Sequence, residues 1–221
     1  MTRNAFLSFS FVFFIAVIGT IINKLPLKEW NSTADKPLIF YVSGDGGYSG
    51  FSENICTMIN KMGYKITALN SKSYFDDQKT PEQTTNDIVT YLNTEFNKRK
   101  NQQLVLTGYS FGADIVPFVT NILPDSLKKK LISVVLLSPS RSTDFETHIW
   151  DMLGGKKKRS KDVVAEINKM GTMKTAIILE DEADFPVNEI KLKNYNYYKL
   201  AGGHHFEGKT NEVVKTMMKY F

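Results

Sequence analysis

The stretch that decides the fold reads Leu104-Val-Leu-Thr-Gly-Tyr-Ser-Phe-Gly-Ala-Asp-Ile-Val-Pro-Phe118. Its first residues are apolar or β-branched, as in a buried strand, and a helix-like pattern follows Gly112. Between the two, Gly108-Tyr-Ser-Phe-Gly112 matches the G-x-S-x-G pattern of a nucleophile elbow, where a strained serine stands on a sharp strand-to-helix turn. Glycines are expected on both sides because strand and helix pass too closely there for side chains. The pattern predicts Ser110 as a nucleophile; the alternative is a serine that only caps the helix.

The segments around this stretch alternate between strand and helix patterns. Further buried strands are expected at 38–42, 64–69, 131–137, 175–179 and 195–200, with helical periodicity between them. This alternation predicts a single mostly parallel sheet of about six strands flanked by helices, the α/β class. Together with the elbow pattern at Ser110, it leads us to expect the α/β-hydrolase fold. Such sheets carry their sites at the carboxyl ends of central strands, where Ser110 is expected. We expect one domain over residues 38–221.

The N-terminus predicts an exported protein. An apolar run without charge extends from Ala5 to Ile22. It fits either a signal peptide or a retained anchor, and the lack of a convincing A-x-A-like cleavage site favours the anchor. We expect a signal or anchor over residues 1–23 and a tether over residues 24–37.

Composition excludes several functional classes. The formal net charge of +5 is small and dispersed, so no nucleic-acid partner is expected. One basic cluster, Lys156 to Arg159 with Lys161, is expected to be a solvated loop, with contact to an anionic membrane surface as the alternative. The single cysteine, Cys56, excludes an internal disulfide, and no Cys/His spacing suits a metal. We expect neither a cofactor nor a metal.

A serine nucleophile needs a base, and the base needs an orienting carboxylate. In this fold the chain order is serine, acid, histidine. The loop after the last expected strand reads Ala201-Gly-Gly-His-His-Phe-Glu207, so the base is either His204 or His205, and we favour His205. Two glycines give this loop the freedom to reach over Ser110.

The acid is expected after the strand at 175–179. The sequence Glu180-Asp-Glu-Ala-Asp184 supplies four carboxylates there. We favour Asp184, which precedes a Phe-Pro turn that could fix it, with Asp181 as the second choice.

The negative oxygen formed during acyl transfer needs two aligned N–H donors. One is expected from the backbone of Phe111, directly after the nucleophile. The other is expected from Asp45 or Gly46, in the glycine-rich loop Ser43-Gly-Asp-Gly-Gly47. A phosphate-cradling role for this loop is the alternative, but it lacks the G-x-x-x-x-G-K pattern.

Five motifs occur in order along the chain. They are Ser43-Gly-Asp-Gly-Gly47, Tyr74-Phe75 with Lys79-Thr-Pro-Glu82, Gly108-Tyr-Ser-Phe-Gly-Ala-Asp114 with Pro117, Asp144-Phe-Glu-Thr-His148, and Gly202-Gly-His-His-Phe206. With them the chain resembles the VirJ/AcvB bacterial virulence-protein family of α/β-hydrolases. The chain departs from the expected pattern at Tyr48, where a tryptophan is expected, and at Glu180, where a glycine is expected.

The resemblance implies roles for individual residues. Ser110 would be the nucleophile, the pair His204/His205 would supply the base, and Asp114 and His148 would line the site. Tyr48, in the tryptophan position, is also taken as substrate-lining.

The resemblance also implies a setting and a substrate. The setting is the periplasm of a Gram-negative bacterium, with the protein anchored to the inner membrane or released after signal cleavage. The implied activity is hydrolysis of aminoacylated phosphatidylglycerol, notably its lysyl form, and the implied partners include secretion-system proteins. The first hypothesis is therefore an exported serine hydrolase that cleaves an ester. The alternatives are a non-catalytic periplasmic adaptor for secretion substrates and a general carboxylesterase or thioesterase.

Overall fold

A computed structural model describes residues 25–48, 50–99, 102–146 and 159–221 of the chain. The predicted signal or anchor, His148 and the basic residues 156–158 lie outside these ranges. Within them, none of the helices combines the length and the hydropathy that crossing a bilayer requires.

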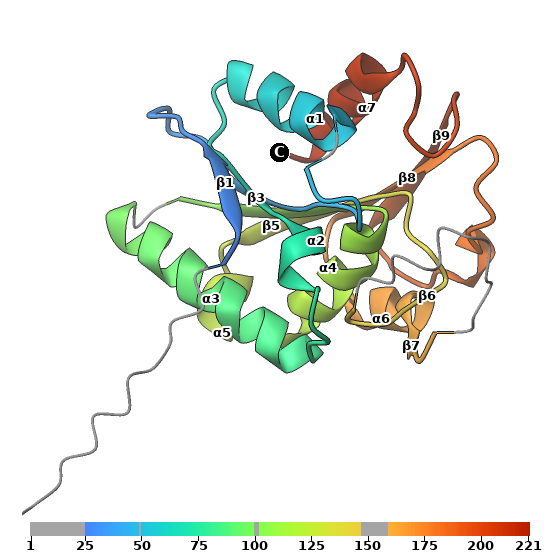
Figure 1. Cartoon of the computed structure of the whole chain (residues 1–221), viewed down its shortest axis with the longest axis horizontal. Helices are drawn as coiled ribbons and strands as arrows, with labels where there is room; N and C mark the ends of the chain where they lie inside the picture. Colours follow the sequence, from blue (N-terminus) through green and yellow to red (C-terminus); the bar gives the residue numbers. More distant parts are fainter. Residues whose placement is uncertain (1–24, 49, 100–101, 147–158) are drawn as a thin grey trace, which may run out of the picture.

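A seven-stranded sheet forms the centre of the molecule (Figure 1). Its order is β1 (Leu27–Trp30), β3 (Ile66–Leu69), β2 (Leu38–Val42), β4 (Leu104–Tyr109), β5 (Leu131–Leu137), β8 (Thr175–Glu180) and β9 (Tyr195–Leu200). All neighbouring strands are parallel except β1, which pairs antiparallel with β3. The mostly parallel sheet and all six expected strands are confirmed.

The seventh strand, β1, occupies part of the segment predicted as a tether. It pairs Leu27 with Leu69 and Trp30 with Ile66 at the edge of the sheet. Its sequence Leu-Lys-Glu-Trp is short and half charged, so it lacks the continuous apolar run that marks the buried strands. Edge strands need only one paired side, which is why such a sequence can join the sheet.

Helices cover both faces of the sheet (Figure 1). One face carries α1 (Gly50–Lys61) and α7 (Thr210–Met217). The other face carries α3 (Pro81–Lys98), α4 (Phe111–Ile122), α5 (Asp125–Lys128) and α6 (Val163–Lys169). A short helix, α2 (Ser71–Tyr74), follows β3, and a small ribbon of β6 (Ser142–Thr143) and β7 (Lys161–Asp162) lies beside α6.

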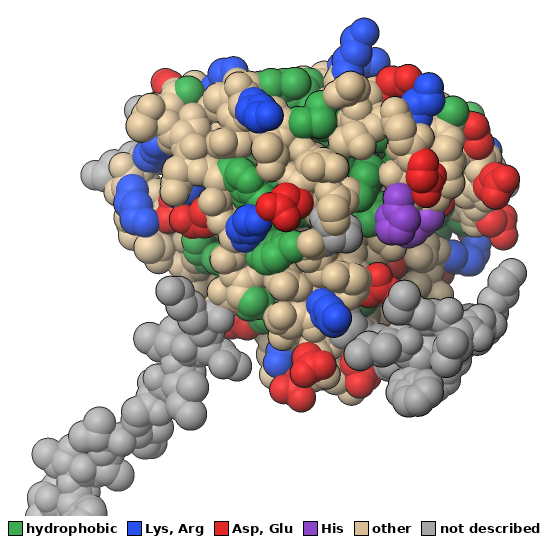
Figure 2. Space-filling model, turned by 45° about the horizontal axis from the view of Figure 1, so that its top comes forward, with side chains coloured by type: hydrophobic (Ala, Val, Ile, Leu, Met, Phe, Trp, Pro, Cys, Tyr) green, Lys and Arg blue, Asp and Glu red, His purple; other side chains and the backbone are tan. Residues whose placement is uncertain are grey.

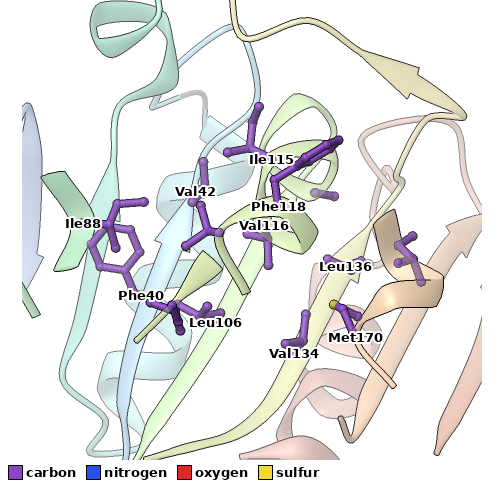
Figure 3. Close-up of a cluster of buried hydrophobic side chains, with 14 of the residues drawn as sticks. Phe40, Val42, Ile88, Leu106, Ile115, Val116, Phe118, Val134, Leu136 and Met170 are labelled. Atoms are coloured by element: carbon purple, nitrogen blue, oxygen red, sulfur yellow. The ribbon is translucent and has the colours of Figure 1, made fainter. Parts of the chain in front are cut away.

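Each face of the sheet has its own apolar cluster. Figure 3 shows the larger one, where Phe40, Val42, Leu106, Val134 and Leu136 from the strands meet Ile115, Val116 and Phe118 of α4. Burying a large apolar side chain contributes roughly 1.5–3 kcal/mol. This packing fixes α4 against the centre of the sheet, and the turn between β4 and α4 holds Ser110.

Candidate active site

The turn at Ser110 has the backbone geometry expected of a nucleophile elbow. Ser110 has φ 51° and ψ −122°, a left-handed conformation that non-glycine residues rarely adopt. A Cβ atom at Gly108 would collide with the carbonyl group of Gly112, and one at Gly112 would collide with the carbonyl oxygen of Val42. Both glycines are therefore required by space, as the sequence pattern predicts. The conformation lifts the serine side chain to the carboxyl end of the sheet.

Three side chains from three parts of the chain meet at this end. His204, in the loop after β9, has its Nε2 2.8 Å from the Oγ of Ser110. Its Nδ1 lies 3.2 Å from Oε1 of Glu180, the last residue of β8. The hydroxyl of Ser138, just beyond β5, donates to the other carboxylate oxygen of Glu180 at 2.6 Å. The series Ser110–His204–Glu180 has the geometry of nucleophile, base and orienting acid.

The preference for His205 is corrected by this geometry. The Nδ1 of His205 lies 2.6 Å from the hydroxyl of Tyr109, and its neighbour His204 faces Ser110. The next residue, Phe206, is fully buried at φ 48°, which fixes the path of the loop and so decides which histidine faces the serine. Both histidines are exposed, and histidine side chains are visible at the surface beside acidic ones (Figure 2).

The preference for Asp184, with Asp181 second, is corrected as well. Both aspartates are exposed, whereas Glu180 reaches His204 from the end of β8. Strand β8 pairs with β9, and the register places Glu180 opposite Leu200, the residue after which the loop with His204 begins. The sequence signal was the carboxylate directly at the strand end, at the position where the family resemblance predicts a glycine.

Glu180 and His204 shift each other's pKa. The hydrogen bond with Glu180 raises the pKa of His204 above its usual value, and this effect exceeds the lowering caused by partial burial. Burial alone would raise the pKa of Glu180, but hydrogen bonds from His204 and Ser138 hold it below its usual value. Glu180 is therefore ionised at neutral pH and favours the proton on Nδ1 of His204. The Nε2 is then free to accept the proton of Ser110.

The expected N–H donors lie around the serine. Phe111 is the first residue of α4, so its N–H has no partner within the helix. A Cβ at Gly44 would lie 3.5 Å from the Cβ of Ser110, so the glycine-rich loop passes beside the elbow. The N–H of Gly46 donates to the side chain of Asp45 at 2.8 Å. This leaves the N–H of Asp45, rather than that of Gly46, as the second candidate donor.

Asp114 is buried in the first turns of α4. One carboxylate oxygen accepts the backbone N–H of Ser140 at 2.6 Å, and the other has no partner among the described residues. Burial raises the pKa of Asp114 to about 7, against the hydrogen bonding of Ser140 and the positive charges of Arg159 and His204. A buried carboxyl oxygen without a partner is uncommon and requires a reason.

Tyr48 was expected to line the substrate site. Its hydroxyl instead lies within hydrogen-bonding distance of two backbone carbonyls, 2.6 Å from that of Ala68 and 3.0 Å from that of Pro26. The hydroxyl is thus engaged with the backbone beside β3 and is not turned toward Ser110. In the part of the chain that the structure describes, no histidine, cysteine or acidic side chains gather as a metal site would require.

Comparison with known proteins places this geometry in context. A comparison with curated protein sequences gave no match. Among solved structures, Est1E from Butyrivibrio proteoclasticus with bound ferulic acid is similar at 16% identity and a TM-score of 0.60, covering 90% of this chain and 97% of that one. A monoacylglycerol lipase from Paleococcus ferrophilus is similar at 12% identity and a TM-score of 0.57, covering 89% and 99%.

A thioesterase domain from the curacin biosynthetic pathway also matches, at 12% identity and a TM-score of 0.58, covering 87% of this chain and 94% of that one. At these identities the likeness shows the fold, which is that of the α/β-hydrolases. The family described as "Bacterial virulence protein (VirJ)" matches residues 35–221. The chain therefore belongs to the VirJ family of bacterial virulence proteins.

Proposed function

We propose that this chain is a serine hydrolase that cleaves esters. The observation that carries the proposal is the hydrogen-bonded series Ser110–His204–Glu180 on a strained elbow. A hydroxyl with a base at 2.8 Å and an ionised orienting acid behind that base is the arrangement that makes serine a nucleophile. Esterases, a lipase and a thioesterase among similar folds agree with this class of reaction.

The proposed reaction proceeds in two halves. The Oγ of Ser110 attacks the acyl carbon while Nε2 of His204 takes the hydroxyl proton, and Glu180 stabilises the imidazolium that forms. The N–H groups of Phe111 and Asp45 bind the negative oxygen. The alcohol leaves with the proton from His204. Water, deprotonated by the same histidine, then attacks the acyl-serine, and the acid leaves as His204 returns this proton to Oγ of Ser110.

We further propose that the substrate is the aminoacyl ester of an aminoacylated phosphatidylglycerol, and that the enzyme works in the periplasm. The family resemblance, the apolar run of residues 5–22 and Asp114 support this choice. An aminoacyl group carries an ammonium, and the buried carboxyl of Asp114, partly ionised at neutral pH because its pKa is about 7, supplies a partial counter-charge near His204. A general carboxylic ester or a thioester is the second candidate, favoured by the likeness to a thioesterase domain.

A fluorophosphonate probe tests the reaction. The probe should label the wild-type protein covalently, and Ser110→Ala should remove the label completely because the nucleophilic oxygen is gone. Gel fluorescence measures the labelling, and a melting curve shows that the variant is folded. Competition by liposomes tests the substrate: lysyl-phosphatidylglycerol should slow labelling, and liposomes of plain phosphatidylglycerol should not. Absence of label on folded wild-type protein would contradict the proposal and favour the non-catalytic adaptor.

The pH dependence of hydrolysis follows from the His204–Glu180 pair. His204 acts as a base only when neutral, and Glu180 raises its pKa, so kcat/KM should fall as the pH drops through a midpoint above the usual histidine value of about 6.5. Glu180→Gln removes the negative charge, so this midpoint should move to lower pH while kcat falls. A pH–rate profile on a soluble ester measures both effects.

Asp114→Asn is the control for this pH profile. Asp114 has a pKa of about 7 and titrates in the same range, so it could be mistaken for His204. We expect Asp114→Asn to move the midpoint far less than Glu180→Gln does, since Glu180 contacts the histidine directly. A larger shift in Asp114→Asn would mean that the fall of kcat/KM at low pH reports the titration of Asp114 and not that of His204.

A further inference from the structure

Tyr109, the residue directly before the nucleophile, contacts both histidines. Its hydroxyl lies 3.0 Å from the carbonyl oxygen of His204 and 2.6 Å from Nδ1 of His205. The proposed base is therefore tied to the strand that carries the nucleophile. Ser110, its chain neighbour Tyr109 and His204 thus form a closed ring of contacts, because Nε2 of His204 also lies 2.8 Å from Oγ of Ser110.

Counting protons fixes the direction of these hydrogen bonds. A phenol has one proton, and a carbonyl oxygen only accepts. If both contacts are hydrogen bonds, Tyr109 donates to the carbonyl of His204, and the Nδ1 of His205 carries a proton that it donates to Tyr109. Burial, with the negative charges of Glu180 and Asp45, keeps the pKa of Tyr109 well above its usual value, so the phenol keeps its proton.

Packing holds the phenol in place. The ring of Tyr109 lies 4.8 Å from that of Phe51 on α1, measured between centroids, and Phe51 stacks on Phe206 at 5.8 Å. Tyr109 is 3% exposed and Phe206 is fully buried. The packing of Phe206 on Phe51 thus fixes the loop that carries the two histidines, and the hydroxyl of Tyr109 provides a second contact with the same loop.

The loop needs such support. The side chain of His204 is 48% exposed, and the loop contains Gly202 at φ 111° and the strained Phe206. A side chain carboxylate oxygen of Glu207 accepts the N–H of Gly203 at 2.8 Å, which holds the segment before the base. The segment at the base itself is held by the hydroxyl of Tyr109. A displacement of about 1 Å at a catalytic group can cost about 100-fold in rate.

We propose that Tyr109 and His205 are positioning residues that form a clamp on the backbone of His204, with His205 protonated on Nδ1. The inference rests on the proposed function, in which His204 is the base. The clamp also gives His205 a role. Because His205 donates its Nδ1 proton to the hydroxyl oxygen of Tyr109, the single proton of that hydroxyl stays available for the carbonyl oxygen of His204. The adjacent pair of histidines then consists of one base and one hydrogen-bond donor.

Kinetics on p-nitrophenyl acetate test the clamp. Tyr109→Phe keeps the ring against Phe51 but loses the hydroxyl, so kcat should fall about 10- to 100-fold with little change in KM. Tyr198→Phe is the matched control: it removes another hydroxyl from the same sheet, bonded to that of Tyr220 at 3.1 Å, and should leave kcat unchanged. Equal kcat in Tyr109→Phe and wild type would overturn the clamp.

Two substitutions at His205 test the direction of the bond. His205→Asn can place an N–H at the position of Nδ1 and should keep most of the activity. His205→Asp places only acceptor oxygens there, draws the proton of Tyr109 away from His204, and should lose about as much kcat as Tyr109→Phe. Equal activity of the two variants, with both folded by melting curve, would contradict the proposed direction.

Nitrogen-15 NMR of the full chain separates the clamp from the proposed function. Wild-type His205 should show a directly bonded proton on Nδ1, and Tyr109→Phe should lose this preference. If the fluorophosphonate probe labels Ser110 but Nδ1 carries no proton, the clamp fails alone. If the probe does not label folded wild-type protein, the proposed function fails and the positioning role fails with it.

Discussion

Replacing His204 with alanine is expected to lower kcat at least about 10³-fold, because no other side chain in the described structure stands within hydrogen-bonding distance of Ser110 Oγ to take its proton. His205→Ala is expected to lower kcat only about 10-fold, since it removes a support of the loop and leaves the base in place. Steady-state turnover of p-nitrophenyl acetate by both purified variants measures the difference.

The two variants control for each other. They remove the same side chain from neighbouring, exposed positions of one loop, so general effects on solubility or loop stability should be similar. They differ in their contacts, because His204 lies between Ser110 and Glu180 whereas His205 contacts the hydroxyl of Tyr109. If His205→Ala is the weaker enzyme, the base is His205, as the sequence suggested, and the loop must rearrange during the reaction. If both lose 10³-fold, the clamp is as important as the base.

The elbow could be predicted from sequence because its residues are dictated by local geometry. The glycines at 108 and 112 leave no room for a Cβ, and Ser110 must adopt a positive φ. The constraint at Gly108 acts within five residues of the chain, whereas the one at Gly112 comes from the backbone of Val42 on the neighbouring strand β2. The buried strands are equally predictable from the sequence, because a parallel strand covered on both faces must be apolar throughout. The mostly parallel sheet is therefore confirmed, and the nucleophilic role of Ser110 stays a prediction.

The partners of the serine depend on contacts across the fold, which sequence order alone does not encode. His204 and His205 differ by one residue, and the choice between them is made by the buried side chain of Phe206 and its packing on Phe51. The acid depends on how far β8 extends before its loop. The strand runs through Glu180, one residue beyond the predicted end, and the side chain that reaches His204 lies there.

The same limit applies at the other edge of the sheet. Residues 27–30 carry two charged side chains, and their strand exists because β3 offers an unpaired edge. The sequence of these four residues alone does not indicate that an unpaired strand edge lies beside them. Sequence reasoning thus succeeded where a residue's own neighbours decide its conformation, and failed where a distant element decides it.

Gly112→Ala should abolish folding or reduce the free energy of unfolding by about 4 kcal/mol or more. Alanine favours a helix interior over glycine by about 1 kcal/mol, so helix propensity alone would predict stabilisation. The new Cβ, however, would overlap the carbonyl oxygen of Val42 on β2, and it would lie 2.6 Å from that of Ser43. These are backbone atoms held by the sheet, so they cannot move aside as the end of a flexible side chain could, and the steric term should exceed the propensity gain.

Gly50→Ala is the control, because its Cβ would meet no atom within 4 Å at the start of α1. Thermal melts should show Gly50→Ala near the wild type and Gly112→Ala unfolded or strongly destabilised. A wild-type melting temperature for Gly112→Ala would mean that α4 can shift away from β2, and that the elbow is not fixed by this close approach.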